Sequence, residues 1–152
     1  MGLDMYLRAK KYVSNYEFWP EEKELNKKLR ESLGVDHISD DHASVEVAIG
    51  VGYWRKANQI HAWFVENVQK GEDNCHEYYV DREQLKELLD LCKETLETKN
   101  AELLPPQSGF FFGSTDIDEY YWSDIEHTIE MLESVLNDRA LDKFDFQYQS
   151  SW

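Results

Sequence analysis

Twelve consecutive residues bring together several kinds of side chain that could do chemistry. The stretch Tyr53–Phe64 contains two indoles, two cations, two carboxamides and one imidazole. At about 100° per residue on a helix, Trp54, Asn58 and His61 share one edge of an apolar arc. There an indole can stack on a ring, a carboxamide can pair with donors and acceptors, and an imidazole can exchange a proton. This pattern predicts a ligand pocket. The alternative is that all three side chains are ordinary, hydrogen-bonded core residues.

Two glycines precede this stretch, in the segment Ile49-Gly50-Val51-Gly52. Backbone amides at a strand-to-helix turn can bind an anion, and Arg55 and Lys56 would add positive charge beside it. The third glycine of a dinucleotide fingerprint is missing, as is the Gly-Lys-Ser/Thr of a phosphate-binding loop. The alternative is therefore a tight turn without a ligand. The predicted ligand-binding residues are Gly50, Gly52, Trp54, Arg55, Lys56, Asn58 and His61.

A second candidate site is the polar loop that follows the first predicted helix. Two imidazoles and three carboxylates fall within seven residues, and such a set could hold a divalent metal ion with an open position for water. The spacing matches no established metal motif, and Asp and His are also common loop residues. We predict no other cofactor. The candidate metal ligands are Asp36, His37, Asp40, Asp41 and His42.

The net charge of −15 limits the partners of this protein. Nucleic-acid phosphates and an acidic membrane surface would both be repelled, so we expect neither direct nucleic-acid binding nor membrane binding. No apolar run reaches the ~20 residues of a membrane span, and no secretory signal is apparent. Cys75 and Cys92 are too few for a disulfide scaffold, which favours a reducing cytosol.

Hydrophobic periodicity predicts an α+β fold in one domain, residues 1–152, with a small, mainly antiparallel sheet and three to four helices packed on it. Pro20 and Gly34 mark the ends of the first helix, and Asp81 is placed to cap a later one. The predicted strands cover residues 3–13, 45–50, 109–113 and 144–148. The predicted helices cover residues 20–33, 53–69 and 82–98, and a last one runs from a cap at Ser114 or Thr115 to about Asp138.

Several segments resemble a family of small proteins encoded by bacteriophages and by bacterial genomes. The segments are Met1–Leu7 (MGLDMYL), the Tyr53–Phe64 block, Leu103–Pro105, Gly109–Thr115 (GFFFGST) and Tyr148–Trp152 (YQSSW). The resemblance covers most of the chain but carries over no catalytic residues. It implies a bacterial cytosol as the setting and an accessory protein of a phage that acts on its host.

Three functional hypotheses follow, and the lack of any recognisable nucleophile motif favours binding over catalysis. The first is a ligand-binding protein that sequesters a small anionic, nucleotide-like molecule. The second is an acidic mimic of nucleic acid that blocks a basic host protein through a stripe of carboxylates. The third is a metal-assisted hydrolase that uses the Asp36–His42 loop. The carboxylate stripe consists of Glu119, Glu126, Glu130 and Glu133.

Overall fold

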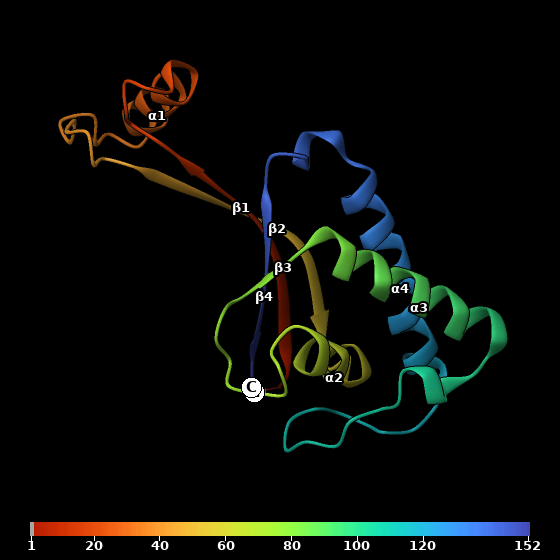
Figure 1. Ribbon diagram of the computed structural model, residues 1–152. Coiled ribbons are helices and arrows are strands. Elements are labelled where there is room, and N and C mark those ends of the chain that lie inside the picture. Colours follow the sequence, from red (N-terminus) through yellow and green to blue (C-terminus); the bar gives the residue numbers. More distant parts are fainter. Residues whose placement is uncertain (1) are drawn as a thin grey trace. The chain divides into compact units, whose positions relative to one another are not determined.

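The computed structural model describes residues 2–152 and confirms the α+β fold (Figure 1). Four antiparallel strands form one sheet in the order β2-β1-β4-β3. In chain order the elements are β1 (Asp4–Val13), α1 (Pro20–Ser32), β2 (Val45–Arg55), α2 (Asn58–Asn67), β3 (Tyr78–Val80), α3 (Arg82–Thr98), the 3₁₀ turn η1 (Ala101–Leu103), α4 (Glu119–Asn137), the 3₁₀ turn η2 (Arg139–Leu141) and β4 (Asp145–Ser151).

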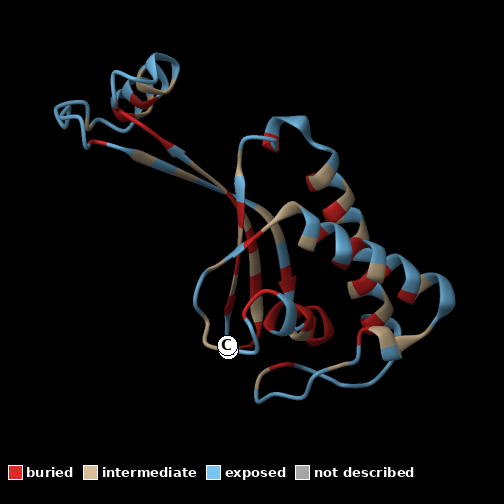
Figure 2. Cartoon of the chain, viewed as in Figure 1, coloured by how far each residue is buried: buried red, intermediate tan, exposed pale blue. Residues whose placement is uncertain are grey.

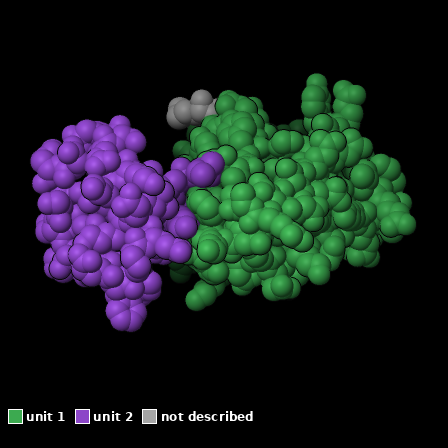
Figure 3. Space-filling model, turned by 90° about the horizontal axis from the view of Figure 1, so that it is seen from above, with its two compact units in different colours: residues 1–9, 50–152 green, residues 10–49 purple. Residues whose placement is uncertain are grey.

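The chain divides into two compact units (Figure 3). Unit 1 comprises residues 1–9 and 50–152, and unit 2 comprises residues 10–49. Strands β1 and β2 contribute residues to both units. The candidate ligand-binding residues belong to unit 1, and the candidate metal ligands belong to unit 2.

The core of unit 1 lies between its part of the sheet and helices α2, α3 and α4, which cover one face of that sheet (Figures 1 and 2). Leu3 precedes β1 and, like Met5 and Leu7 within it, is fully buried, whereas Tyr6 and Arg8 are only partly buried. This alternation is expected because successive side chains of a strand point to opposite faces of the sheet.

Helices α3 and α4 are the long amphipathic helices of unit 1, and they pack against each other. Asp81 caps α3 as predicted, since its carboxylate accepts from the Gln84 amide at 2.8 Å and the Gln84 side chain accepts from the Asp81 amide in return. Helix α4 begins at Glu119 with Asp118 as its cap, so the prediction of a cap at Ser114 or Thr115 was wrong. Its predicted apolar stripe is buried from Tyr121 to Val135.

Unit 2 has a polar interior that the sequence pattern did not predict. Leu25 of α1 and Leu33, which follows the helix, are exposed although they recur at helical spacing. The buried residues of α1 are Asn26 and Arg30. Asn26 donates to the carbonyls of Val13 and Ala43 at 2.9 and 2.8 Å, so it joins the end of β1 to the segment before β2. Arg30 is held in turn by Asn26.

Two further differences concern short strands. Residues 109–113 form a turn rather than the predicted buried strand, and Phe110 is exposed. The three residues of β3, Tyr78–Val80, pair with β4 and were not predicted. A strand of three residues is too short for its side-chain alternation to be recognised in the sequence.

Within residues 2–152, no helix combines the length and the apolar character needed to cross a membrane.

Candidate ligand-binding site

The predicted pocket residues lie at the junction between β2 and α2. Strand β2 continues through Arg55, and the helix begins only at Asn58, so the prediction of a helix from Tyr53 was wrong. The chain turns at Lys56, which has a φ of 59°, and the Lys56 amide donates to the Leu3 carbonyl at 2.7 Å. Pairing with β1 therefore outweighs the helical periodicity of Tyr53–Phe64.

The two glycines lie within β2 and do not form an anion-binding turn. A Cβ at Gly52 would lie 2.0 Å from the Met131 sulfur and 3.2 Å from Leu7 Cβ, whereas a Cβ at Gly50 would meet nothing within 4 Å. Gly52 therefore allows α4 to approach the sheet closely. The structure gives the predicted anion-binding role of Gly50 and Gly52 no geometric basis.

Trp54 and His61 lie in the core and do not line a ligand cavity. Trp54 is 2% exposed, and its Nε1 donates to Thr128 Oγ1 on α4 at 2.9 Å. Its ring contacts Phe64 edge-on. His61 is completely buried. Both residues are thus hydrogen-bonded core residues, the alternative that the sequence left open.

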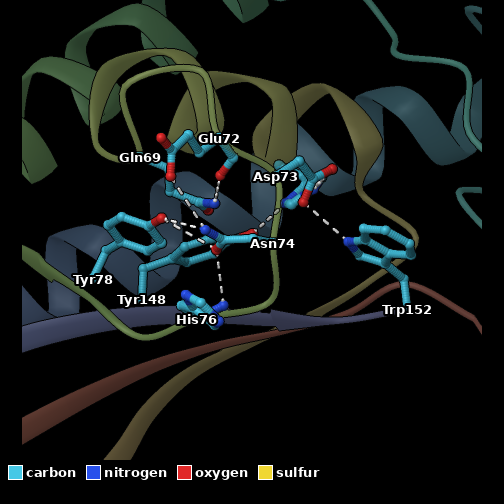
Figure 4. A network of polar contacts seen from close by, with 9 residues as sticks. Gln69, Glu72, Asp73, Asn74, His76, Tyr78, Tyr148 and Trp152 are labelled. Carbon is cyan, nitrogen blue, oxygen red and sulfur yellow. Dashed lines mark hydrogen bonds and ion pairs between the residues drawn. The ribbon is translucent and has the colours of Figure 1, made fainter.

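His61 belongs to a polar network that ties α2 to β4 and to the loop after α2. Figure 4 shows Asp73, Tyr148 and Trp152 of this network. Its Nδ1 lies 2.7 Å from the Tyr148 hydroxyl, and its Nε2 lies 3.0 Å from Asp73 Oδ2. Trp152 Nε1 donates to the other Asp73 oxygen at 3.0 Å. Burial lowers the pKa of His61, against the opposing effect of Asp73, so the neutral imidazole is favoured.

Asn58 is also buried, and it fixes one wall of a cavity. Its Nδ2 donates to the carbonyls of Phe112 and Ser114 at 3.0 and 2.9 Å, and its Oδ1 accepts from the Gln107 amide at 2.9 Å. These bonds hold the loop before α4 against the start of α2. The carboxamide therefore positions the wall and has little capacity left for a ligand.

The cavity next to Asn58 has a volume of about 260 Å³. Of the seven predicted ligand-binding residues, Arg55, Lys56 and Asn58 line it, while Gly50, Gly52, Trp54 and His61 do not. Its remaining lining comes from α2, the segment before α4, and α4 itself. The full set is Arg55, Lys56, Asn58, Gln59, Pro106, Gly113, Ser114, Asp116, Asp118, Tyr120, Tyr121 and Asp124.

One end of the cavity is the N-terminus of α2. The cap position is Ala57, which makes no side-chain cap, and the first turn of α2 contains no acidic residue. Helix α4, by contrast, has the Asp118 carboxylate on its first amides. The start of α2 therefore keeps its partial positive charge, and the cations Arg55 and Lys56 precede it directly. This end of the cavity favours an anion.

The two cations at the cavity, Arg55 and Lys56, make different contacts within the protein. Arg55 Nη1 lies 3.2 Å from Asp4 Oδ1, and Tyr53 donates its hydroxyl proton to the same carboxylate. Lys56 packs its side-chain carbons close to Gly113, where a Cβ would lie 3.1 Å from Lys56 Cβ. The absence of a side chain at Gly113 gives Lys56 room at the cavity wall.

Helix α4 contributes an acidic side chain to the cavity. Asp124 lines it, and burial raises the pKa of this carboxyl to about 6, against the lowering effects of Gln59 and His127. Gln59 Nε2 lies 3.4 Å from Asp124 Oδ2 and 3.4 Å from the Tyr121 carbonyl. A partly desolvated carboxylate in a cavity is a common mark of a functional site.

Sequence reasoning missed Gln59, Tyr120 and Asp124. Gln59 was not among the predicted ligand-binding residues, and it is buried. Asp124 is one of many carboxylates in an acidic chain, and only its contact with Gln59 singles it out. Tyr120 is 72% exposed at the cavity wall, so its ring is accessible for stacking.

The candidate metal ligands Asp36, His37, Asp40, Asp41 and His42 do not form a ligand set. Among residues 2–152, no group of three or more His, Cys, Asp or Glu side chains is placed to hold a metal ion. Asp40 instead accepts from the His42 amide at 2.8 Å, and His42 Nδ1 lies 3.2 Å from the Tyr16 hydroxyl. These contacts organise the loop of unit 2.

The predicted carboxylate stripe lies on α4. Glu119, Glu126 and Glu130 are exposed, whereas Glu133 forms an ion pair with Lys93 of α3 at 2.7 Å. One of the four carboxylates is thus partly neutralised within unit 1.

Comparisons of the chain with protein-family models, curated proteins and solved structures give no match.

Proposed function

We propose that this protein binds a small anionic molecule that contains a ring, such as a nucleotide. The observation that carries the proposal is a cavity of about 260 Å³ that combines an uncapped helix N-terminus with two cations and a partly buried carboxylate. Ligand pockets typically combine an apolar wall with a few convergent polar groups of this kind.

The anionic group of the ligand would occupy the α2 end of the cavity. There Arg55 and Lys56 can donate to phosphate oxygens, and the positive end of the α2 dipole adds to their charge, although the amides of Asn58 and Ile60 already donate to the carbonyls of Lys56 and Ala57. Asp116, Asp118 and Asp124 also line the cavity and would repel a phosphate. The charge distribution therefore supports one orientation of the ligand, with its anion next to α2.

The ring of the ligand would lie towards α4. Tyr120 is the exposed aromatic residue of the cavity and takes over the stacking role that the sequence suggested for Trp54. The volume is slightly below the ~300–1,000 Å³ typical of ligand pockets, which favours a mononucleotide-sized molecule over a dinucleotide.

The proposed setting is the cytosol of a bacterium, where a phage accessory protein of this kind would sequester a nucleotide of the host. This setting rests on the resemblance of segments such as Met1–Leu7 and Tyr53–Phe64 to proteins of phages and bacteria. Sequestration requires binding but no chemical step, which agrees with the absence of a recognisable nucleophile motif in the sequence.

Calorimetric titration with a panel of nucleoside monophosphates tests the proposal. The double variant Arg55→Gln, Lys56→Asn removes both cations, and asparagine is among the residues that best tolerate the positive φ at position 56. We expect the wild-type protein to bind a member of the panel, and the variant to bind it at least about tenfold more weakly, because hydrogen bonds to charged groups are lost.

The matched control is Arg139→Gln, Lys143→Asn, which makes the same change in net charge at two exposed positions outside the cavity. It should bind like the wild-type protein. Equal weakening in both double variants would reduce the effect to overall charge and contradict the proposed site.

A further inference from the structure

Three carboxylates line the cavity, and they differ in what they can still accept. Asp118 already accepts from the amides of Tyr120 and Tyr121 at 3.0 and 3.1 Å. Asp116 is exposed, so water competes for its hydrogen bonds. Asp124 is partly buried and can gain more from donor groups of a ligand.

The Asp124 carboxylate is also held in place. Gln59, which is almost fully buried, lies with its Nε2 3.4 Å from Asp124 Oδ2 and 3.4 Å from the Tyr121 carbonyl. Gln59 thereby ties the carboxylate on α4 to the start of α2. An ionised carboxylate has about four lone-pair positions, so each oxygen can still accept from a ligand after this contact.

Resting on the proposed function, we infer that the cavity selects a guanine-type ring, with the two adjacent N–H groups of its edge donating to Asp124. Guanine presents a ring N–H and an amino group side by side, and a carboxylate accepts from both. Adenine presents one donor beside one acceptor, and hypoxanthine lacks the amino group. Both therefore leave a carboxylate less well satisfied.

The rest of the cavity suits the same ligand. Tyr120, four residues before Asp124 on α4, lies about one helical turn away on the same side of the helix and is exposed at the cavity wall. A planar base that donates to Asp124 can therefore stack on this ring. Its phosphate then points to the α2 end with Arg55 and Lys56.

Calorimetric titration with GMP, IMP and AMP tests the inference. For the wild-type protein we expect GMP to bind at least about fivefold more tightly than IMP or AMP, as for a bidentate pair to a base edge. In Asp124→Asn, one carboxylate oxygen becomes an amide donor. GMP should then lose its advantage, whereas XMP, which has an acceptor in place of the amino group, should bind more tightly than GMP.

A merely structural role of Asp124 would weaken GMP and XMP alike, so the exchange of preference separates recognition from folding. Similar affinities for GMP, IMP and AMP, with all three weakened in the Arg55→Gln, Lys56→Asn variant, would overturn the inference and leave the proposed function in place. No binding of any of the three would overturn the inference, and no binding of any nucleoside monophosphate in the panel would overturn the proposed function as well.

Discussion

Replacing Trp54 with alanine is expected to lower the free energy of unfolding by about 3–5 kcal/mol. The indole is buried between β2 and α4, contacts Phe64 edge-on and donates to Thr128. Its removal leaves a large void and takes away the hydrogen bond that Thr128 Oγ1 accepts, while the Thr128 hydroxyl still donates to the Asp124 carbonyl. Urea denaturation followed by circular dichroism measures the loss.

The control is Phe110→Ala, because Phe110 is 91% exposed and its loss should change stability by less than about 0.5 kcal/mol. A loss below about 1 kcal/mol at Trp54 would contradict its place in the core. If the prediction holds, a Trp54 variant is unsuited to testing ligand binding, because unfolding would mimic a loss of affinity.

Replacing His61 with leucine is expected to cost roughly 2–5 kcal/mol, because it leaves both Tyr148 and Asp73 without their histidine partner. The effect should depend on pH. The pKa of His61 is lowered in the folded protein, so below the unfolded value of about 6.5 the unfolded chain binds more protons. The stability contribution of this histidine is therefore lost as the pH falls below about 6.5.

The effect of Asp124 on the pH dependence of stability has the opposite sign. Its folded pKa of about 6 exceeds the unfolded value of 3.8, so its contribution is present at low pH and is lost as the pH rises through about 6. Comparing the His61→Leu variant with the wild-type protein at each pH cancels this effect. The difference in stability should shrink from pH 7 to pH 5. A difference that is constant with pH would contradict a buried neutral His61.

The sequence was sufficient to predict elements whose local signals agree. For α3, the cap at Asp81 and the apolar stripe both predict the same helix. For α1, Pro20 and Gly34 mark the two ends of the helix. The start of α2 was misplaced because Tyr53–Phe64 has helical periodicity throughout, and only the pairing of β2 with β1 makes its first residues extended.

The candidate site was predicted in part for a similar reason. Arg55 and Lys56 were predicted in the first turn of a helix, whereas in the structure they directly precede α2 and line the cavity. Trp54 and His61 were expected beside them because all four were assigned to one helix. In the structure Trp54 belongs to β2, and His61 lies in the first turn of α2. Both side chains are buried in the core. Asp124 lies 65 residues from Gln59 in the chain, and a contact over such a separation produces no local pattern from which a single sequence could predict it.

The central claim is that a small anionic molecule binds where α2 begins. It is tested most directly by an NMR titration of the ¹⁵N-labelled protein with GMP, in which each backbone amide reports separately. We expect shifts concentrated at Ala57, Asn58 and Gln59 and at Tyr120 and Asp124 of α4, all of which saturate together. Saturable shifts confined to other parts of the chain, or none at millimolar GMP, would contradict it.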